Sequence, residues 1–281
     1  MASTVESAFG QMGVRVRIAP LRSPSEQRRP WNGRPRGNRQ RPAQQPVRFD
    51  VLRDGRGEYF DIRRRPDVSL NVPEVIPDDR HLVLIAQPTG FGDGSTSAFL
   101  CGHDERAWFV AAVPEDARVR TVQDAKDALK PQEVWDAMKE FAVPMEERDQ
   151  RRTAAFLRQG EWFFIPCPDM QVDCSEVVYN EPIRRGAGKP HRCEAMYRRE
   201  GERVYVSANY PNGLTWAEFR ALPDSERRSH RWEDRVRGAE VYVRGKVHHR
   251  DHATIFLAFW HKVVMNTETK SRAMENVAFL D

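Results

Sequence analysis

Residues 240–267 read EVYVRGKVHHRDHATIFLAFWHKVVMNT, and the fold class of the chain follows from this segment. It divides into three short runs, EVYVRGKVHH, ATIFLAFW and HKVVMNT, rich in the β-branched and aromatic residues that strands favour. The dipeptide Asp251-His252 directly precedes the second run and predicts a turn there. Short strands joined by turns predict antiparallel β-structure in this part of the chain.

Similar runs occur upstream, so we assign residues 156–281 to one β-domain. They are FLRQGEWFFIPCP (156–168), predicted as one strand stopped by its prolines, EVVYNEP (176–182) and ERVYVSA (202–208). Turn signals about every ten residues favour a β-barrel or jelly-roll-like sandwich. Residues 213–236 are instead charged with spaced aromatics, and Thr215 stands in a capping position, so we predict a helical insertion there.

Residues 47–144 predict a first domain, a small antiparallel sheet followed by helices. A Gly-rich turn within FDVLRDGRGEYFDIRR (49–64) indicates a hairpin, and HLVLIAQ (81–87), SAFLCGH (97–103) and AWFVAAV (107–113) indicate strands. Thr121 stands at a helix N-cap, and Pro131 should divide the following helical pattern in two. With residues 145–155 as a polar linker, the chain is expected to be mainly β, α+β overall.

Arginine is concentrated before this first domain. Between Arg15 and Arg48 there are ten arginines, no lysine and one acidic residue, a charge of 10 − 1 = +9. Because the whole chain carries +4, the rest sums to 4 − 9 = −5. Residues 28–46 contain four prolines and almost no aliphatic side chains, so they cannot bury enough apolar surface to offset chain entropy. We therefore predict a disordered arginine-rich arm over residues 1–46.

This arm is suited to nucleic acid. Guanidinium groups pair with phosphates and stack on bases, and a tryptophan adds a stacking face. The predicted RNA- or DNA-binding residues are Arg28, Arg29, Trp31, Arg34, Arg36, Arg39 and Arg41. A basic arm also docks on acidic protein surfaces, and this alternative stays open.

Composition and motifs exclude several classes of protein. The longest apolar stretch, Ala253 to Trp260, is far shorter than the roughly 20 residues of a membrane-spanning helix, so we expect no membrane contact. The N-terminus lacks the features of a secretory signal, which favours a cytoplasmic protein. Four cysteines are too few for a disulfide scaffold. Sequence motifs of P-loop nucleotide hydrolases, serine hydrolases, dinucleotide-binding domains and zincins are absent.

Histidines near the end of the chain suggest a metal site. His249 and His252 converge only if a turn intervenes at Arg250 and Asp251, and His191 and Cys193 share one face if they are on a strand. Imidazole and thiolate suit zinc or iron. All four ligands together would make a closed site, whereas three ligands and a water would make an open, catalytic one. A hydrogen-bonded polar network without any metal is the alternative.

A metal-dependent enzyme would also need acid–base groups and cations near the metal. Asp251 or Glu194 is the candidate general base, and Lys189 or Arg185 would stabilise developing negative charge.

Three segments of the second domain, RQGEWFFIP (158–166), GAGKPHRCE (186–194) and GKVHHRDHATIFL (245–257), carry a resemblance. They resemble a type of small bacterial and phage-encoded β-protein of uncharacterised activity. That type opens with QGD, an apolar strand and IP, and later carries a GHxH and an HxEH element. The resemblance implies that His191 matches a GHxH histidine, with Cys193 replacing the second, and that His249 and His252 match HxEH. Glu161 stands in the place of the Asp of the QGD element. The resemblance implies no particular reaction.

The resulting functional hypothesis is a nucleic-acid-associated accessory or assembly protein, with the arm contacting phosphates and the β-domain carrying a His/Cys cluster. Two alternatives are a metal-dependent hydrolase acting on phosphoesters and a structural subunit of a larger complex.

Overall fold

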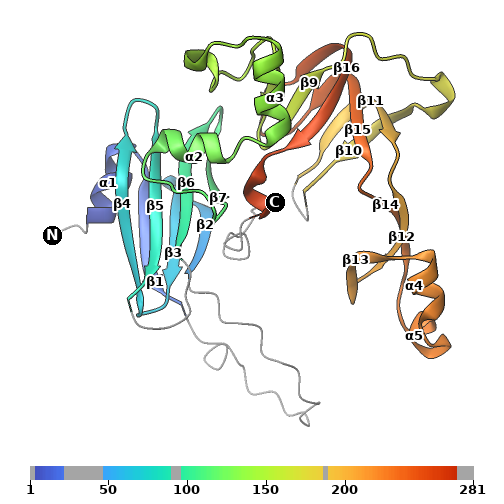
Figure 1. Ribbon diagram of the computed structural model, residues 1–281. Coiled ribbons are helices and arrows are strands. Elements are labelled where there is room, and N and C mark those ends of the chain that lie inside the picture. Colours follow the sequence, from blue (N-terminus) through green and yellow to red (C-terminus); the bar gives the residue numbers. More distant parts are fainter. Residues whose placement is uncertain (1–3, 22–46, 90–95, 186–188, 271–281) are drawn as a thin grey trace.

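The structure is a computed structural model that describes residues 4–21, 47–89, 96–185 and 189–270 (Figure 1). Within these ranges the chain is mainly β, with four sheets accompanied by short helices, which confirms the predicted fold class. No helix in the described ranges has the length and apolarity needed to cross a bilayer.

The first half of the chain forms two sheets that pack face to face. One sheet has the order β1-β3-β2, with β1 parallel to β3, and the other has the antiparallel order β4-β5-β6-β7. The elements are α1 (Thr4–Gln11), β1 (Arg15–Pro20), β2 (Val47–Asp54), β3 (Gly57–Arg64), β4 (Val68–Ile76), β5 (His81–Pro88), β6 (Ser97–Asp104) and β7 (Ala107–Val113).

β5 explains why this part of the sequence contains a continuous apolar run. Leu82 and Leu84 point into the core between the two sheets, where they join Phe49 and Phe60. Val83, on the opposite face, packs against α2 (Val122–Ala128) in a second core. Because both faces of β5 are buried, alternation with polar residues is not required.

The two helices that follow β7 begin where the sequence predicts. Thr121 caps α2 in a capping box with Asp124, and Pro131 is the N-cap residue of α3 (Gln132–Glu140). The predicted division at Pro131 is therefore confirmed. The short 3-10 helix η1 (Met145–Glu147) follows within the predicted linker.

In the second half, six antiparallel strands form one open sheet in the order β10-β11-β15-β16-β9-β8. Among the described residues no sheet closes into a barrel, so the expected barrel or jelly roll is corrected to an open sheet. A helix and a loop cover the two faces of this sheet. α3 packs against β9 and β16, and residues 167–177 cover Tyr242 and Trp260.

The strands are β8 (Leu157–Gln159), β9 (Trp162–Pro166), β10 (Val178–Ile183), β11 (His191–Arg199), β15 (Glu240–His248) and β16 (Ile255–Met265). The short 3-10 helices η2 (Cys174–Glu176) and η3 (Thr267–Lys270) lie before β10 and after β16.

Two strand predictions need correction. Residues 156–168 form a hairpin rather than one strand, because Gly160 adopts a φ of +59° and turns the chain between β8 and β9. The two runs on either side of Trp260 form one continuous strand, β16, since no turn-forming residue separates them.

The predicted helical insertion is present and carries a small sheet of its own. α4 (Trp216–Ala221) and α5 (Asp224–Ser229) lie beside a three-stranded sheet of order β13-β12-β14. Figure 1 shows this unit projecting from one end of β11 and β15. Its strands are β12 (Glu202–Ser207), β13 (Tyr210–Thr215) and β14 (Glu233–Arg237), and Thr215 caps α4 as expected.

The predicted arm also needs correction at its start. Residues 4–21 form α1 and β1, because Val5, Ala8 and Phe9 are apolar at helical spacing and are buried. Arg15 and Arg17, counted with the arm, form ion pairs with Asp54 and Asp61. The predicted nucleic-acid-binding residues, all between residues 28 and 41, lie outside the described residues.

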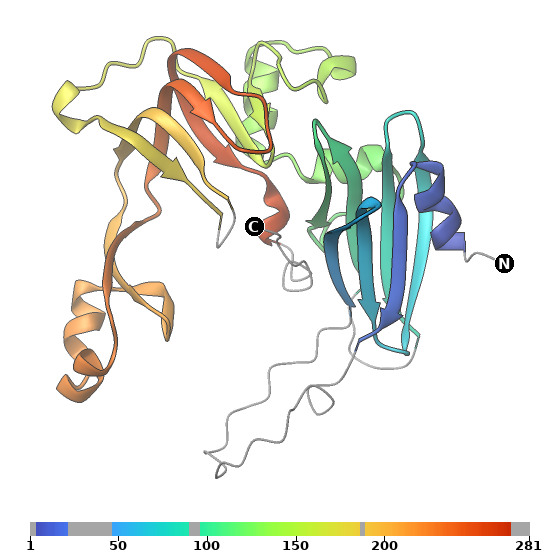
Figure 2. The same ribbon diagram turned by 180° about the vertical axis from the view of Figure 1, so that it is seen from behind.

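The two halves lie side by side in both views (Figures 1 and 2) and contact each other directly. The hydroxyl of Thr267 donates to the Ala128 carbonyl at 2.6 Å, and the Thr267 amide donates to Leu129 at 3.1 Å. Arg151 also pairs with Asp104 and Glu105 at the β6–β7 turn. The division into two domains with a linker at 145–155 stays a prediction.

Candidate metal centre

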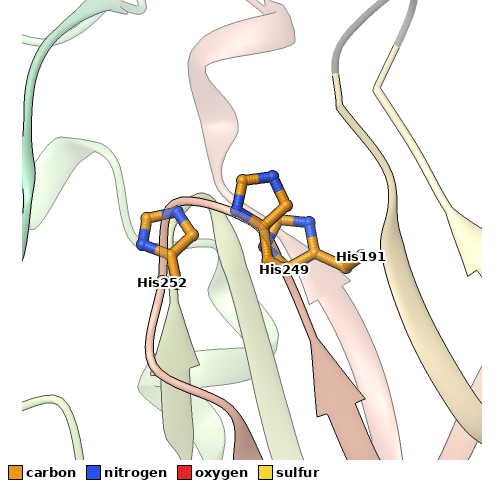
Figure 3. Close-up of side chains that lie close together, drawn as sticks. All are labelled: His191, His249 and His252. Atoms are coloured by element: carbon orange, nitrogen blue, oxygen red, sulfur yellow. The ribbon is translucent and has the colours of Figure 1, made fainter.

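Three of the predicted ligands converge in one place. His191, His249 and His252 each offer one ring nitrogen, and these three atoms all lie within 4.8 Å of one another. Figure 3 shows the three rings grouped at the end of the strands. Three histidines are thus close enough to hold a metal ion.

Strand register and one turn bring these residues together. Arg192 on β11 is opposite His248 on β15, which places His191 next to His249 just beyond the last paired residues. The chain turns after His249, and His252 follows within the loop that leads into β16. The turn predicted at Arg250 and Asp251 is confirmed.

The three rings stack on one another. The centroids of His191 and His249 are 4.1 Å apart with planes at 17°, and those of His249 and His252 are 4.7 Å apart at 30°. Because two imidazolium rings in such proximity would repel each other, the stack of His191 on His249 favours the neutral form of these two rings.

Burial enforces that neutrality. The side chain of His191 is almost completely buried, which together with the neighbouring His249 and His252 lowers its pKa to about 3. The pKa of His249 is also lowered, first by burial and then by His252. Neutral imidazole is the form that binds metal ions, so these ligands need not lose a proton at neutral pH.

Several ring nitrogens lack a hydrogen-bond partner. Both Nδ1 and Nε2 of His191, and Nδ1 of His252, are buried without such a bond to any described residue. Each buried polar group left in this way costs about 1–3 kcal/mol. A bound ion would supply a partner for one nitrogen of each ring, and the missing bonds are an argument against the purely hydrogen-bonded network.

The ring of His249 has hydrogen-bond partners in the backbone of Lys189 and of Asp251. The Asp251 amide donates to Nδ1 of His249 at 3.2 Å, which holds the ring over the turn. Coordination of an ion by this ring would need a small rotation or the loss of that bond, at a cost of about 1 kcal/mol.

Outer residues fix the loop that carries His252. Glu105, at the β6–β7 turn, accepts the Ala253 amide at 2.7 Å and lies 3.7 Å from Nδ1 of His252. Gln159 donates to the Ala253 carbonyl at 2.6 Å. A Cβ at Gly160 would stand 2.9 Å from Nε2 of His252, so only glycine leaves room for this ring.

Of the two predicted general bases, Asp251 lies beside the histidines and Glu194 does not. Asp251 accepts a hydrogen bond from Nζ of Lys189 at 3.0 Å. Partial burial acts to raise the pKa of Asp251, but the hydrogen bond from Lys189 and the nearby charges together outweigh this effect, so the pKa is lowered. An ionised Asp251 therefore lies in the same turn as the histidines and can accept a proton.

Cys193 and Glu194 are not part of the histidine group. Cys193 is buried among Phe164, Met196 and Val247, and burial raises its thiol pKa to about 12. A thiol held neutral in this way is a packing residue rather than a ligand. Glu194 accepts the Lys246 amide at 2.8 Å, where a β-bulge interrupts the pairing of β11 and β15.

The site borders a cleft between the two halves. The cleft has a volume of about 980 Å³, and His252 and Asp251 lie in its wall. Arg185 and Lys189 also line it, but Arg185 pairs with Glu268 and Lys189 with Asp251.

Another cation in the wall has no such partner. Arg250, between His249 and His252 in the sequence, is exposed, lines the cleft and forms no ion pair with a described residue. Arg250 is thus better placed to meet an anion than the two cations expected from the sequence.

Comparisons of the chain with protein-family models, with curated proteins and with solved structures gave no match. The resemblance to the small bacterial and phage β-proteins therefore stays a prediction. The structure does give its QG dipeptide a physical role, because Gln159 and Gly160 both support the His252 loop. Glu105 was missed, since nothing in its local sequence marks a residue that acts on a loop 148 positions away.

Proposed function

We propose that this protein is a metal-dependent hydrolase acting on phosphoesters, with one zinc ion held by His191, His249 and His252. The observation that carries the proposal is the convergence of three histidines beside a cleft, with His191 and His249 buried and with ring nitrogens of His191 and His252 that lack a hydrogen-bond partner among the described residues. Three histidines and an open position are typical of catalytic zinc, and iron is the alternative ion. When bound, such an ion lowers the pKa of water and polarises a phosphoryl oxygen.

The residues around the ion have distinct roles in this proposal. Asp251 accepts the proton of the attacking water as the new P–O bond forms and the ester P–O bond breaks. Lys189, hydrogen-bonded to Asp251, holds this carboxylate ionised and in place. Arg250 binds the phosphoryl oxygens, where negative charge increases. The leaving oxygen takes its proton from solvent in the cleft.

Hydrolysis of bis(para-nitrophenyl) phosphate by zinc-loaded and chelator-stripped protein tests the proposal. We expect activity only with the metal, a loss on His249→Ala, and a loss of about 10²- to 10⁴-fold on Asp251→Asn. His248→Ala is the matched control, because His248 is the exposed neighbour outside the group. Equal activity in stripped and loaded protein would contradict the proposal.

The nucleic-acid-associated accessory protein is the competing proposal. It is favoured by the arginines that line the same cleft, and it needs no hydrolysis. A protein that binds zinc at the three histidines without hydrolysing any phosphoester would favour it.

A further inference from the structure

The cleft extends beyond the metal centre along the first half of the molecule. Besides Arg250 it is lined by Arg106, at the β6–β7 turn, and by Arg53, near the end of β2. All three side chains are exposed, and none forms an ion pair or hydrogen bond with a described residue. Most other charges in the wall are paired within the protein, such as Lys126 with Asp79 and Lys130 with Asp149.

Contacts within the protein connect the three arginines in a row. Arg53 is opposite Glu58 in the β2–β3 hairpin, and Glu58 accepts the Trp108 amide at 3.2 Å. Arg106 lies two residues before Trp108 and next to Glu105. Glu105 in turn binds the Ala253 amide, three residues after Arg250. The row therefore starts at the metal centre and continues across the β6–β7 turn to the β2–β3 hairpin.

Aromatic side chains accompany the row. Trp108 and His103 line the cleft and are partly exposed, with ring centroids 4.9 Å apart and planes at 79°. Unpaired arginines beside partly exposed rings are the combination that binds single-stranded nucleic acid, because phosphates pair with guanidinium groups and unpaired bases stack on rings.

We infer that the cleft binds single-stranded nucleic acid as the substrate, with Arg53, Arg106 and Arg250 each contacting a separate phosphate. A free mononucleotide would use only the cation nearest the metal, whereas a strand would use the whole row. The role of the strand as a substrate rests on the proposed hydrolase activity. Binding of the strand in the cleft does not depend on that activity.

The test is equilibrium binding of a fluorescent oligothymidylate of about twelve nucleotides to the full chain. A chelator is included so that no turnover occurs, and salt is varied. We expect the variant Arg53→Gln/Arg106→Gln/Arg250→Gln to bind at least about tenfold more weakly at low salt than the wild-type protein. The slope of log affinity against log salt should fall by about 2, because each phosphate of a single strand that an arginine neutralises adds roughly 0.7 to that slope.

The matched control is Arg118→Gln/Arg152→Gln/Arg231→Gln. The side chains of these arginines are exposed, form no ion pair or hydrogen bond with a described residue and do not line the cleft. Both variants retain residues 22–46, so the effect of that segment on binding cancels. Equal weakening in the two variants, or none in either, would overturn the inference. Tighter cleft-dependent binding of a duplex, or displacement of the strand by polyglutamate as effectively as by unlabelled strand, would also overturn it.

Failure of this inference differs from failure of the proposed function. Cleft-dependent binding of a strand that stays intact when zinc is restored would leave the binding site standing and contradict the hydrolase. Hydrolysis of bis(para-nitrophenyl) phosphate without cleft-dependent strand binding would support the hydrolase and contradict the strand-binding cleft.

Discussion

His191 is the residue on which the proposed metal centre depends most. It is buried, neutral and without a hydrogen bond to any described residue, although most buried imidazoles have at least one partner. The folded protein without metal therefore carries a local cost at this position. Such a cost is expected at a binding site, where the ligand that relieves it is held more firmly.

This cost predicts that the metal-free protein is sensitive to acid. The pKa of His191 is about 3 in the folded chain and near 6.5 in the unfolded chain. Between these values the unfolded chain binds more protons, so stability is fully present above about pH 6.5 and decreases as the pH falls through this window. A shift of this size corresponds to several kcal/mol, at about 1.4 kcal/mol for each unit.

Urea unfolding of metal-free protein at about pH 7.5 and about pH 5 measures the effect. We expect the wild-type protein to lose more stability between the two values than His191→Asn, which cannot be protonated there. His248→Asn is the control and should behave like the wild-type protein. An identical pH dependence for His191→Asn and wild type would show that His191 is not held neutral.

At the scale of elements, the β8–β9 turn sets the position of His252. Gly160 has a φ of +59° in this turn, and an added Cβ would meet the His252 ring. Gly160→Ala should therefore destabilise the fold by about 1–3 kcal/mol and lower zinc affinity, because the ring must move. Gly55→Ala, where a Cβ would meet nothing within 4 Å, should change neither quantity. Urea unfolding and zinc titration compare the two variants, and unchanged zinc affinity in Gly160→Ala would contradict this role.

Strands and helices were predicted well where a local signal exists. The β2–β3 hairpin has its Gly-rich turn, α2 has Thr121, and the turn at Arg250 has its polar residues. β4 and β11 were missed as strands, since β4 contains Pro73 at an irregularity in its pairing and β11 is rich in charged residues. α1 was missed because the many arginines that follow it masked its short apolar face.

The candidate site was also predicted only where a local sequence signal exists. His249 and His252 are close in the sequence, so one turn was enough to bring them together. That Cys193 does not join them follows from its packing among Phe164, Met196 and Val247, which come from separate strands. The open sheet also could not be read from the strands alone, because α3 and residues 167–177 cover its faces.

At the scale of the whole molecule, Glu105 links the two halves at the proposed metal centre. It belongs to the first half, yet it binds the Ala253 amide and lies beside His252 in the second. Glu105 fixes the loop through the Ala253 amide and places a negative charge beside the His252 ring, and outer carboxylates around metal-binding histidines typically contribute 10- to 100-fold to metal affinity. Docking of the two halves and metal binding should therefore stabilise each other.

Glu105→Gln tests this link. We expect zinc affinity to fall by about tenfold or more, because the amide keeps the shape of the side chain and loses its charge. Glu146→Gln is the control, since Glu146 is an exposed glutamate at η1. Competition with a chromophoric chelator gives both affinities. Equal affinities in the two variants would mean that the second half forms the metal centre without help from the first.

The most direct measurement is the zinc content of the purified full chain, determined by elemental analysis after dialysis against trace zinc. The account predicts one zinc per chain in the wild-type protein, in Cys193→Ser and in His248→Ala. It predicts loss of that zinc in each of His191→Ala, His249→Ala and His252→Ala, with the fold retained by circular dichroism. A folded wild-type protein without zinc, or single histidine variants that retain one zinc per chain, would contradict it.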